Sequence, residues 1–250
     1  MNLTVIVPTR NEAETIGELV ERVDRSLAHT AVDYEVLVVD DSDDDTPTRA
    51  REASEAGSPV RVLHRPPEAR SGGLAGAVQT GIEAAPGSTL IAVMDGDLQH
   101  PPELLPELVD RVLTDADVAV ASRYVAGGGR LSGLDGRGRR LTSLAARAAA
   151  RLLLPRVRRV QDPLSGFFAL RRKVVAATPV RASGFKILLE ILVRGRWARV
   201  AEVPLEMEAR AAGQSNAGAR EGLAYGAQLL RLLVAESRRY LRPAAATSSS

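Results

Sequence analysis

Residues 93–102 of the chain read VMDGDLQHPP, and the interpretation of the whole sequence starts from this stretch. The apolar run from Leu90 to Met94 is short enough for a buried strand, and two carboxylates follow it directly. In an extended chain, residues i and i+2 project to the same side, so Asp95 and Asp97 can address one point in space. Two acids this close repel each other unless a cation or a proton lies between them. We therefore expect the strand to end in a charged corner that holds a cation.

The donor atoms around this corner indicate which cation it would hold. Asp95, Asp97 and Gln99 all offer oxygen, and the chain contains no Cys. This set favours Mg²⁺ or Mn²⁺ over zinc. His100 offers an imidazole, but the two prolines after it favour the start of a helix there. Because Asp-Gly-Asp is also common in turns, the rest of the chain has to decide between a metal site and a turn.

The length and composition of the chain limit the fold. With 250 residues it can bury one substantial core, which predicts a single α/β domain with a C-terminal elaboration. The absence of Cys excludes a disulfide framework and a thiolate metal site, and it fits a reducing cytosol. The first apolar run has no basic segment before it and ends early at Pro8, so we expect a strand and not a signal peptide. The longest charge-free segments fall short of the roughly 18 to 20 apolar residues that cross a bilayer, so no transmembrane helix is expected.

Charge is divided unevenly along the chain. Residues 1–125 hold 10 basic and 23 acidic side chains, whereas residues 126–250 hold 23 basic and 8 acidic ones. A basic half of this kind is typical of a protein with an anionic partner, either nucleic acid or membrane lipid. Only 3% of residues are aromatic, which leaves few platforms for stacking bases. We therefore expect a peripheral membrane surface, and no nucleic acid, as the partner.

Strand and helix patterns alternate through the first half. A mostly parallel sheet with helices on both faces follows from this series. In such sheets ligands bind outside the carboxyl ends of the strands, where Asp40, Ser122 and Arg123 would join the corner described above. The first strand leads into Pro-Thr-Arg-Asn-Glu and no Gly-Lys-Ser/Thr pattern occurs, which excludes the Rossmann dinucleotide site and the P-loop. The predicted strands are 3–7, 34–39, 60–63, 90–94 and 118–121. A first helix is expected after the first strand, with Asn11 as its N-cap, and further helices are expected at 46–56, 72–84 and 102–113.

The second half contains a basic amphipathic segment. Between residues 130 and 159 there are nine Arg and one acid, and six apolar residues recur at helical spacing. This pattern describes either a helix that lies in a membrane interface or one that packs its apolar stripe on the core. Further on we expect strands at 166–170 and 200–203, the latter at a sheet edge, and helices at 183–192 and 218–241. Lys186 lies within the apolar run of the first of these helices, which indicates either a buried ammonium that needs an anion or a surface lysine. The six apolar residues are Leu141, Leu144, Ala145, Ala148, Leu152 and Leu153.

Four motifs together resemble one family. The segments VIVPTRNE (5–12), VVDDS (38–42) and MDGDLQHP (94–101) resemble the GT-A fold of family 2 glycosyltransferases. The segment DPLSGFF (162–168) narrows the resemblance to the polyprenyl-phosphate hexosyltransferases. The resemblance covers about residues 3–217. It implies a GT-A domain over 1–217, with a donor half at about 1–125 and an acceptor or interface half at about 126–217. Apolar spacing predicts a helix at 218–242 after it, and low complexity predicts a disordered tail at 243–250.

The resemblance also implies roles for particular residues. The divalent ion, Mg²⁺ or Mn²⁺, would be held by Asp95, Asp97 and Gln99. Asn216 stands where the family usually has Lys or Arg, which puts one phosphate contact in question. The residues expected to act in catalysis are Asp97, Arg123, Lys186 and Arg210. Those expected to bind the donor are Pro8, Arg10, Glu12, Val39, Asp41, Asp95, Gly96 and Asn216, and those expected to receive the acceptor phosphate are Arg137, Arg139 and Arg140.

The expected reaction is the inverting transfer of a hexose from a nucleotide sugar to a polyprenyl phosphate. No His or Glu is an obvious catalytic base, and a phosphate monoester, largely a dianion at pH 7, needs none. GDP-mannose is the expected donor, and the expected location is the cytoplasmic face of the membrane. The alternatives are a family 2 transferase with another donor, such as UDP-glucose, or with a non-lipid acceptor, and a non-catalytic binding module.

Overall fold

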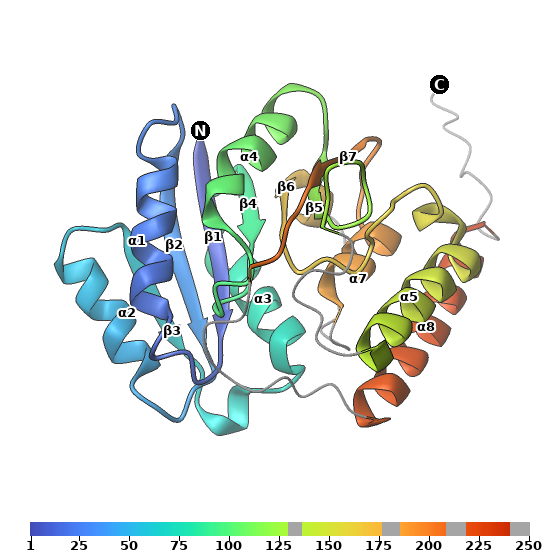
Figure 1. Cartoon of the computed structure of the whole chain (residues 1–250), viewed down its shortest axis with the longest axis horizontal. Helices are drawn as coiled ribbons and strands as arrows, with labels where there is room; N and C mark the ends of the chain where they lie inside the picture. The colour runs from blue at the N-terminus through green and yellow to red at the C-terminus, as the bar shows by residue number, and fades with distance from the viewer. Residues whose placement is uncertain (130–136, 177–185, 209–218, 241–250) are drawn as a thin grey trace, which may run out of the picture.

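The computed structural model of the chain describes residues 1–129, 137–176, 186–208 and 219–240, without the side chains at 137–140, 219–221 and 238–240. A seven-stranded sheet runs through its centre in the order β3-β2-β1-β4-β6-β5-β7 (Figure 1). Among these strands only β6 is antiparallel to its neighbours, so the expected mostly parallel α/β sheet is confirmed. The strands are β1 (Asn2–Thr9), β2 (Asp33–Asp40), β3 (Val60–His64), β4 (Leu90–Val93), β5 (Val118–Ser122), β6 (Phe168–Arg171) and β7 (Val200–Pro204).

Helices cover both faces of the sheet because the central strands carry apolar side chains on both sides. In β1, Val5 and Val7 pack in the same core cluster as α1 and α4, whereas Ile6 packs in a second cluster with α3, α7 and parts of α5 and α8. The helices are α1 (Ile16–Leu27), α2 (Thr46–Glu55), α3 (Gly73–Ala84), α4 (Leu105–Thr114), α5 (Arg137–Leu153), α6 (Lys173–Ala176), α7 (Ile187–Arg194) and α8 (Ala219–Tyr240).

Short 3₁₀ turns extend three of the connections between elements. They are η1 (Pro67–Ala69), η2 (Pro102–Leu104) and η3 (Pro155–Val157), and each begins with proline. Turn η2 occupies the first part of the helix expected at 102–113, so α4 proper begins at Leu105. Among the described residues, no helix combines the length and the hydropathy that a bilayer crossing requires.

Two helix starts differ from the sequence prediction. Asn11 does not cap α1, because its backbone is left-handed, with φ of 60°, and the helix begins at Ile16 after the cap residue Thr15. The helix expected at 183–192 begins at Ile187 within the described residues, and Lys186 stands just before it. Lys186 is exposed, so the expectation of a buried ammonium in this helix is wrong.

Candidate functional site

The loop after β4 lies on the loop after β1. A Cβ built on Gly96 would lie 3.1 Å from Thr9 Cγ2 and 3.5 Å from Glu12 Cγ. Thr15 donates a hydrogen bond of 2.9 Å from Oγ1 to the carbonyl of Gly96, which ties this loop to the start of α1. The carboxyl ends of two parallel strands therefore meet as expected, and a side chain at position 96 would press tightly on Thr9.

The acidic corner keeps a strained backbone. Asp97 is buried, and its Oδ1 accepts the backbone N–H of Gln99 at 3.1 Å. Leu98, between these two residues, has φ of 59°, a conformation that costs a leucine roughly 1–2 kcal/mol. Its side chain is buried, and this packing holds the turn in place. Strain of this kind is common where a loop must present functional groups in a fixed direction.

His100 supports the corner and is not free to bind a metal through Nδ1. Its Nδ1 accepts the backbone N–H of Asp95 at 3.2 Å, so the proton of the neutral ring lies on Nε2. The ring is buried and stacks on Phe167, with 5.3 Å between the ring centroids. His100 therefore connects the acidic corner to the segment 162–168, the last of the four motifs of the family resemblance.

Segment 162–168 closes over Asp95 from the other side. A Cβ built on Gly166 would lie 2.9 Å from Asp95 Oδ2 and 3.1 Å from His100 Cε1. The segment reaches this position because it leads into β6, which runs antiparallel between β4 and β5 and so begins at their carboxyl ends. Sequence reasoning quoted this motif but assigned no role to Gly166, whose absent side chain makes room for a carboxylate.

Arg123 is tied to a buried partner that sequence reasoning missed. Asp162 is fully buried and accepts two hydrogen bonds from the Arg123 guanidinium, at 2.7 and 3.0 Å. Burial lowers the pKa of Arg123, but Asp162 and, more weakly, Asp95 more than offset this, so the pKa is raised above its ordinary value. The guanidinium therefore stays charged in an interior position. The signal in the sequence was a lone acid, Asp162, within an otherwise uncharged motif.

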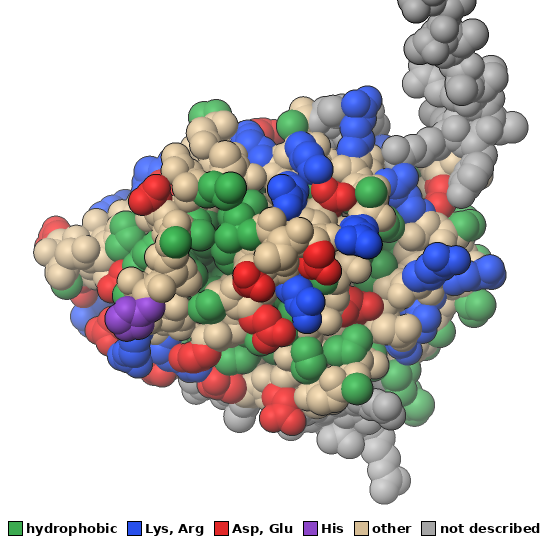
Figure 2. All heavy atoms as spheres, turned by 90° about the horizontal axis from the view of Figure 1, so that it is seen from above, with side chains coloured by type: hydrophobic (Ala, Val, Ile, Leu, Met, Phe, Trp, Pro, Cys, Tyr) green, Lys and Arg blue, Asp and Glu red, His purple; other side chains and the backbone are tan. Residues whose placement is uncertain are grey.

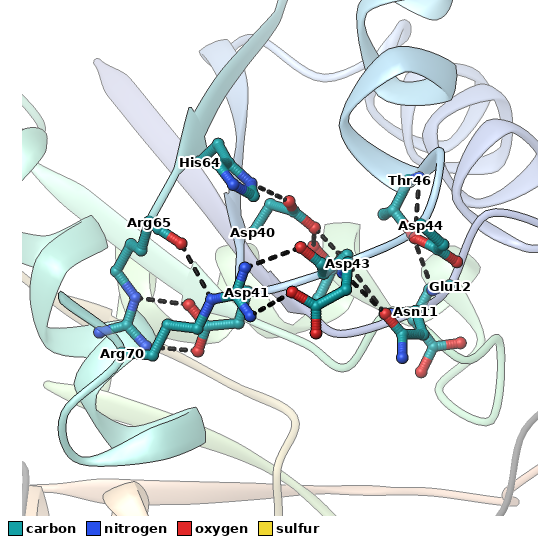
Figure 3. A network of polar contacts seen from close by, with 12 residues as sticks. Asn11, Glu12, Asp40, Asp41, Asp43, Asp44, Thr46, His64, Arg65 and Arg70 are labelled. Carbon is teal, nitrogen blue, oxygen red and sulfur yellow. Dashed lines mark hydrogen bonds and ion pairs between the residues drawn. The ribbon is translucent and has the colours of Figure 1, made fainter. Parts of the chain in front are cut away.

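A second polar network lies at the ends of β2 and β3 (Figure 3). Asp40 is fully buried and accepts hydrogen bonds from Thr9 Oγ1 at 2.8 Å and Ser42 Oγ at 2.5 Å, and its Oδ2 lies 2.6 Å from His64 Nδ1. Beside it, Asp41 accepts two hydrogen bonds from Arg65, at 2.7 and 2.5 Å. The network fixes the loops after β1, β2 and β3 relative to one another.

The residues expected to bind the donor nucleoside differ in how far their side chains reach solvent. Arg10 is exposed and Glu12 is half-buried, so both side chains reach solvent at the sheet edge. Asp41 is buried and paired with Arg65, which leaves its carboxylate less free than expected. Val39 is wholly buried in the core beside Ile6 and Leu37, so its side chain supports the site from behind. Pro8 is buried within β1.

Some expected site residues fall outside the described part of the chain. Arg210 and Asn216 lie in the segment 209–218, and the side chains of Arg137, Arg139 and Arg140 lie among those not described. Their expected roles remain predictions. Lys186 is exposed, and its expected contact with a donor phosphate also remains a prediction.

The oxygen donors of the corner fit a hard divalent cation. Within the described residues no group of three His, Asp or Glu side chains is placed to hold a metal by itself. Asp95 is about one-third exposed, and Asp97 and Gln99 lie within four residues of it along the same loop. Two carboxylates with an amide oxygen are a typical partial ligand set for Mg²⁺ or Mn²⁺, which commonly complete their coordination with water and substrate phosphates.

Comparison with known proteins supports the interpretation of the motifs. The family model for glycosyl transferase family 2 matches residues 4–177. The chain is 41% identical over 234 residues to a dolichol-phosphate mannosyltransferase of Pyrococcus furiosus, covering 93% of this chain and 64% of that protein. It is 34% identical over 244 residues to the dolichol-phosphate mannosyltransferase of Saccharomyces cerevisiae, covering 92% of this chain and 86% of that one.

A solved structure extends the likeness to the whole fold. It is glucosyl-3-phosphoglycerate synthase from Mycobacterium tuberculosis, in complex with Mn²⁺, uridine-diphosphate-glucose and glycerol 3-phosphate. The TM-score is 0.65 at 24% identity, covering 97% of this chain and 82% of that one. The family model covers well over half of the chain, and its motifs meet at one edge of the sheet. The chain belongs to glycosyl transferase family 2.

Proposed function

We propose that the protein transfers mannose from a nucleoside-diphosphate sugar, GDP-mannose in the first instance, to a polyprenyl phosphate, with inversion at the anomeric carbon. The observation that carries the proposal is the closure of segment 162–168 over Asp95, with Arg123 held beside it by Asp162. The names of the relatives from P. furiosus and S. cerevisiae support the choice of sugar and acceptor. The chain spans 64% of the first of these relatives, so the activity is proposed for this chain and not transferred to it.

The two ends of the donor would lie on different parts of the sheet edge. The nucleoside would lie near Arg10 and Glu12, whose side chains reach solvent after β1. Figure 3 shows Glu12 in the same view as the network of Asp40 and Asp41. Carboxylates accept hydrogen bonds from ribose hydroxyl or base N–H groups, whereas they repel phosphate. The diphosphate would therefore lie at the oxygen ligands Asp95, Asp97 and Gln99, where a bound divalent ion would supply charge stabilisation for the leaving nucleoside diphosphate. Mn²⁺ in the M. tuberculosis neighbour supports a divalent ion in this fold.

The chemistry requires no catalytic base. An oxygen of the acceptor phosphate attacks the anomeric carbon, and the bond from that carbon to the donor diphosphate breaks. At pH 7 the acceptor is largely a dianion, so no proton has to be removed from it. The role of Arg123 is then to hold positive charge in an interior position beside the corner.

The face formed by α5 and α8 would lie against the membrane. Of the nine large hydrophobic side chains that are exposed among the described residues, seven lie on these two helices. Helix α5 turns small residues such as Ala146, Ala149 and Ala150 to the core and leaves its leucines outside. The alternative that α5 packs its leucine stripe on the core is therefore wrong for the leucines whose side chains are described. The seven are Leu141, Leu144, Leu152, Leu153, Leu223, Leu230 and Val234.

A donor and acceptor panel tests the function. The protein is incubated with Mn²⁺ or Mg²⁺ and each of GDP-mannose, UDP-glucose and UDP-GlcNAc, with polyprenyl phosphate or glycerol 3-phosphate as the acceptor. Mass spectrometry should show a mannosyl polyprenyl phosphate from GDP-mannose and no product in the presence of EDTA. Product from another donor, or on glycerol 3-phosphate alone, would contradict the proposed substrates.

Asp97→Ala tests the role of the acidic corner in the reaction. It should abolish transfer while the far-UV circular dichroism stays unchanged. A fully active variant would remove the role assigned to the acidic corner.

A further inference from the structure

A hollow of about 340 Å³ lies along α5. It shares no residue with the acidic corner. It is lined by Arg147, Ala148, Arg151, Leu152 and Arg158. We propose that its three arginines bind the phosphate headgroup of an anionic membrane lipid that is not the acceptor. This inference rests on the proposed function, because it assumes that the face formed by α5 and α8 lies against the membrane.

Neutral partners hold the arginine side chains in place. Arg147 donates from Nε to the carbonyl of Gln161 at 2.5 Å and from Nη2 to Gln161 Oε1 at 2.8 Å, and its guanidinium lies 4.3 Å from the centre of the Tyr124 ring. Arg151 donates from Nε to the carbonyl of Arg158 at 3.1 Å. These bonds fix the direction of both side chains and leave further N–H donors available, since a guanidinium carries five.

The carboxylates of Asp162 and Glu202 act on Arg147 only as weaker, more distant charges than its burial and Arg151. Among the described side chains, none forms an ion pair with these three arginines. Burial and the neighbouring charge of Arg151 lower the pKa of Arg147, which is the effect expected where like charges are held together. A phosphate between them would remove this repulsion, and guanidinium groups match the geometry of phosphate oxygens.

Apolar side chains beside the hollow indicate that the anion is part of an amphiphile. Leu152, in its lining, is 72% exposed, and Leu153 is 44% exposed. Tyr225 of α8 donates to the carbonyl of Ala146 at 2.7 Å, which places α8 and its own exposed leucines alongside α5. In Figure 2 basic and hydrophobic side chains gather at the edge of the molecule where these two helices lie. A free phosphate would use only the arginines, whereas a lipid would use both features.

Vesicle binding tests the site without requiring turnover. The full chain is sedimented with phosphatidylcholine vesicles that contain or lack phosphatidylglycerol, and binding is compared with that of Arg151→Gln/Arg158→Gln. A basic residue near an anionic bilayer contributes roughly fivefold in affinity, so the double variant should bind the anionic vesicles roughly 30-fold more weakly. Arg49→Gln/Arg51→Gln is the matched control, because it removes the same charge from exposed positions on α2 and should change binding little.

Several outcomes would overturn the site. One is equal loss of vesicle binding in the two double variants, and another is equal binding of wild type to neutral and anionic vesicles. A third is displacement of the protein from vesicles by millimolar glycerol 3-phosphate, which would assign the arginines to a soluble phosphate.

Donor hydrolysis by Arg151→Gln/Arg158→Gln should match wild type. If the vesicle result holds while no mannosyl lipid forms with any donor, the headgroup site stands and the proposed function fails.

Discussion

Gly166→Ala tests the contact between segment 162–168 and Asp95 most directly. The added Cβ would lie 2.9 Å from Asp95 Oδ2, 3.1 Å from His100 Cε1 and 3.3 Å from Asp95 Oδ1. Ordinary contact begins near ~3.5 Å, so one group has to move by roughly half an ångström. His100 is held by its stacking on Phe167 and by the N–H of Asp95, whereas the Asp95 carboxylate is partly exposed. The carboxylate is therefore the group that should turn away.

The expected effect falls on activity more than on stability. Displacement of a catalytic group by about 1 Å costs roughly 100-fold, so half that displacement should lower kcat/KM by about 10-fold or more. An overpacked side chain costs about 1–3 kcal/mol, and the low end applies here because Asp95 reaches solvent, which corresponds to a Tm lower by about 2–4 °C. The dissociation constant of Mn²⁺, measured by calorimetry, should rise in parallel with the loss of kcat/KM.

Gly17→Ala is the matched control for this variant. Gly17 lies in α1, and a Cβ added there would meet nothing within 4 Å. The same chemical change at that position should leave the transfer rate and the Mn²⁺ affinity at their wild-type values. If Gly166→Ala also keeps both values, the close approach of segment 162–168 to Asp95 has no part in the reaction, and the argument for this site is wrong.

Three further changes have separable outcomes. Asp162→Asn leaves the buried guanidinium of Arg123 without its counter-charge and should lower the free energy of unfolding by about 3–5 kcal/mol, measured by urea denaturation; a loss below ~1 kcal/mol would show that the pair is not an interior one. EDTA should abolish transfer and Mn²⁺ should restore it, and Mn²⁺ should raise the Tm of wild type but not of Asp95→Asn, whereas an equal rise in both proteins would place the ion elsewhere. Burial raises the pKa of Asp117, but the ammonium of Lys173 and two backbone N–H groups more than offset this and hold the pKa below its usual value. The contribution of Asp117 to the free energy of unfolding is therefore complete above about pH 4 and is lost as the pH falls through the folded-state pKa. Asp117→Asn should therefore be less stable than wild type by about 2 kcal/mol at pH 7, with the difference shrinking below about pH 4, and a difference that stays constant with pH would contradict this assignment.

The strands could be predicted from the sequence because they are short apolar runs that end in polar residues. The run expected at 3–7 forms β1 at 2–9, and the run expected at 200–203 forms β7, which does lie at the edge of the sheet. The meeting of the polar strand ends was also predictable, since it follows from the parallel arrangement alone. The order β4-β6-β5 was not, because β6 pairs with strands about 50 and 80 residues earlier and nothing local in its sequence encodes that pairing.

The errors in the site share one cause, which is that they involve partners distant along the chain. Asn11 looked like a helix cap, but its backbone N–H donates to Ser42 Oγ and its Oδ1 accepts the backbone N–H of Asp43, and these bonds hold it in the left-handed conformation. Asp41 remains an expected donor ligand, but its partner Arg65, which comes from the end of β3 and donates to both of its oxygens, was not predicted. Local patterns gave the right side chains at the sheet edge, whereas their pairing depends on the tertiary fold.

The acidic first half and the basic second half of the chain meet near Asp95. The first half, with its excess of acids, supplies the acidic corner, which would repel a sugar diphosphate unless a cation is bound. The second half supplies the opposite charge through α5, whose arginines lie among exposed leucines. Segment 162–168 joins the two, since Arg147 of α5 contacts Gln161 directly before it and Asp162 within it holds Arg123 of the first half. Helix α5 and the surroundings of Asp95 are therefore linked through the contacts Arg147–Gln161 and Asp162–Arg123, which join the basic half of the chain to the acidic half.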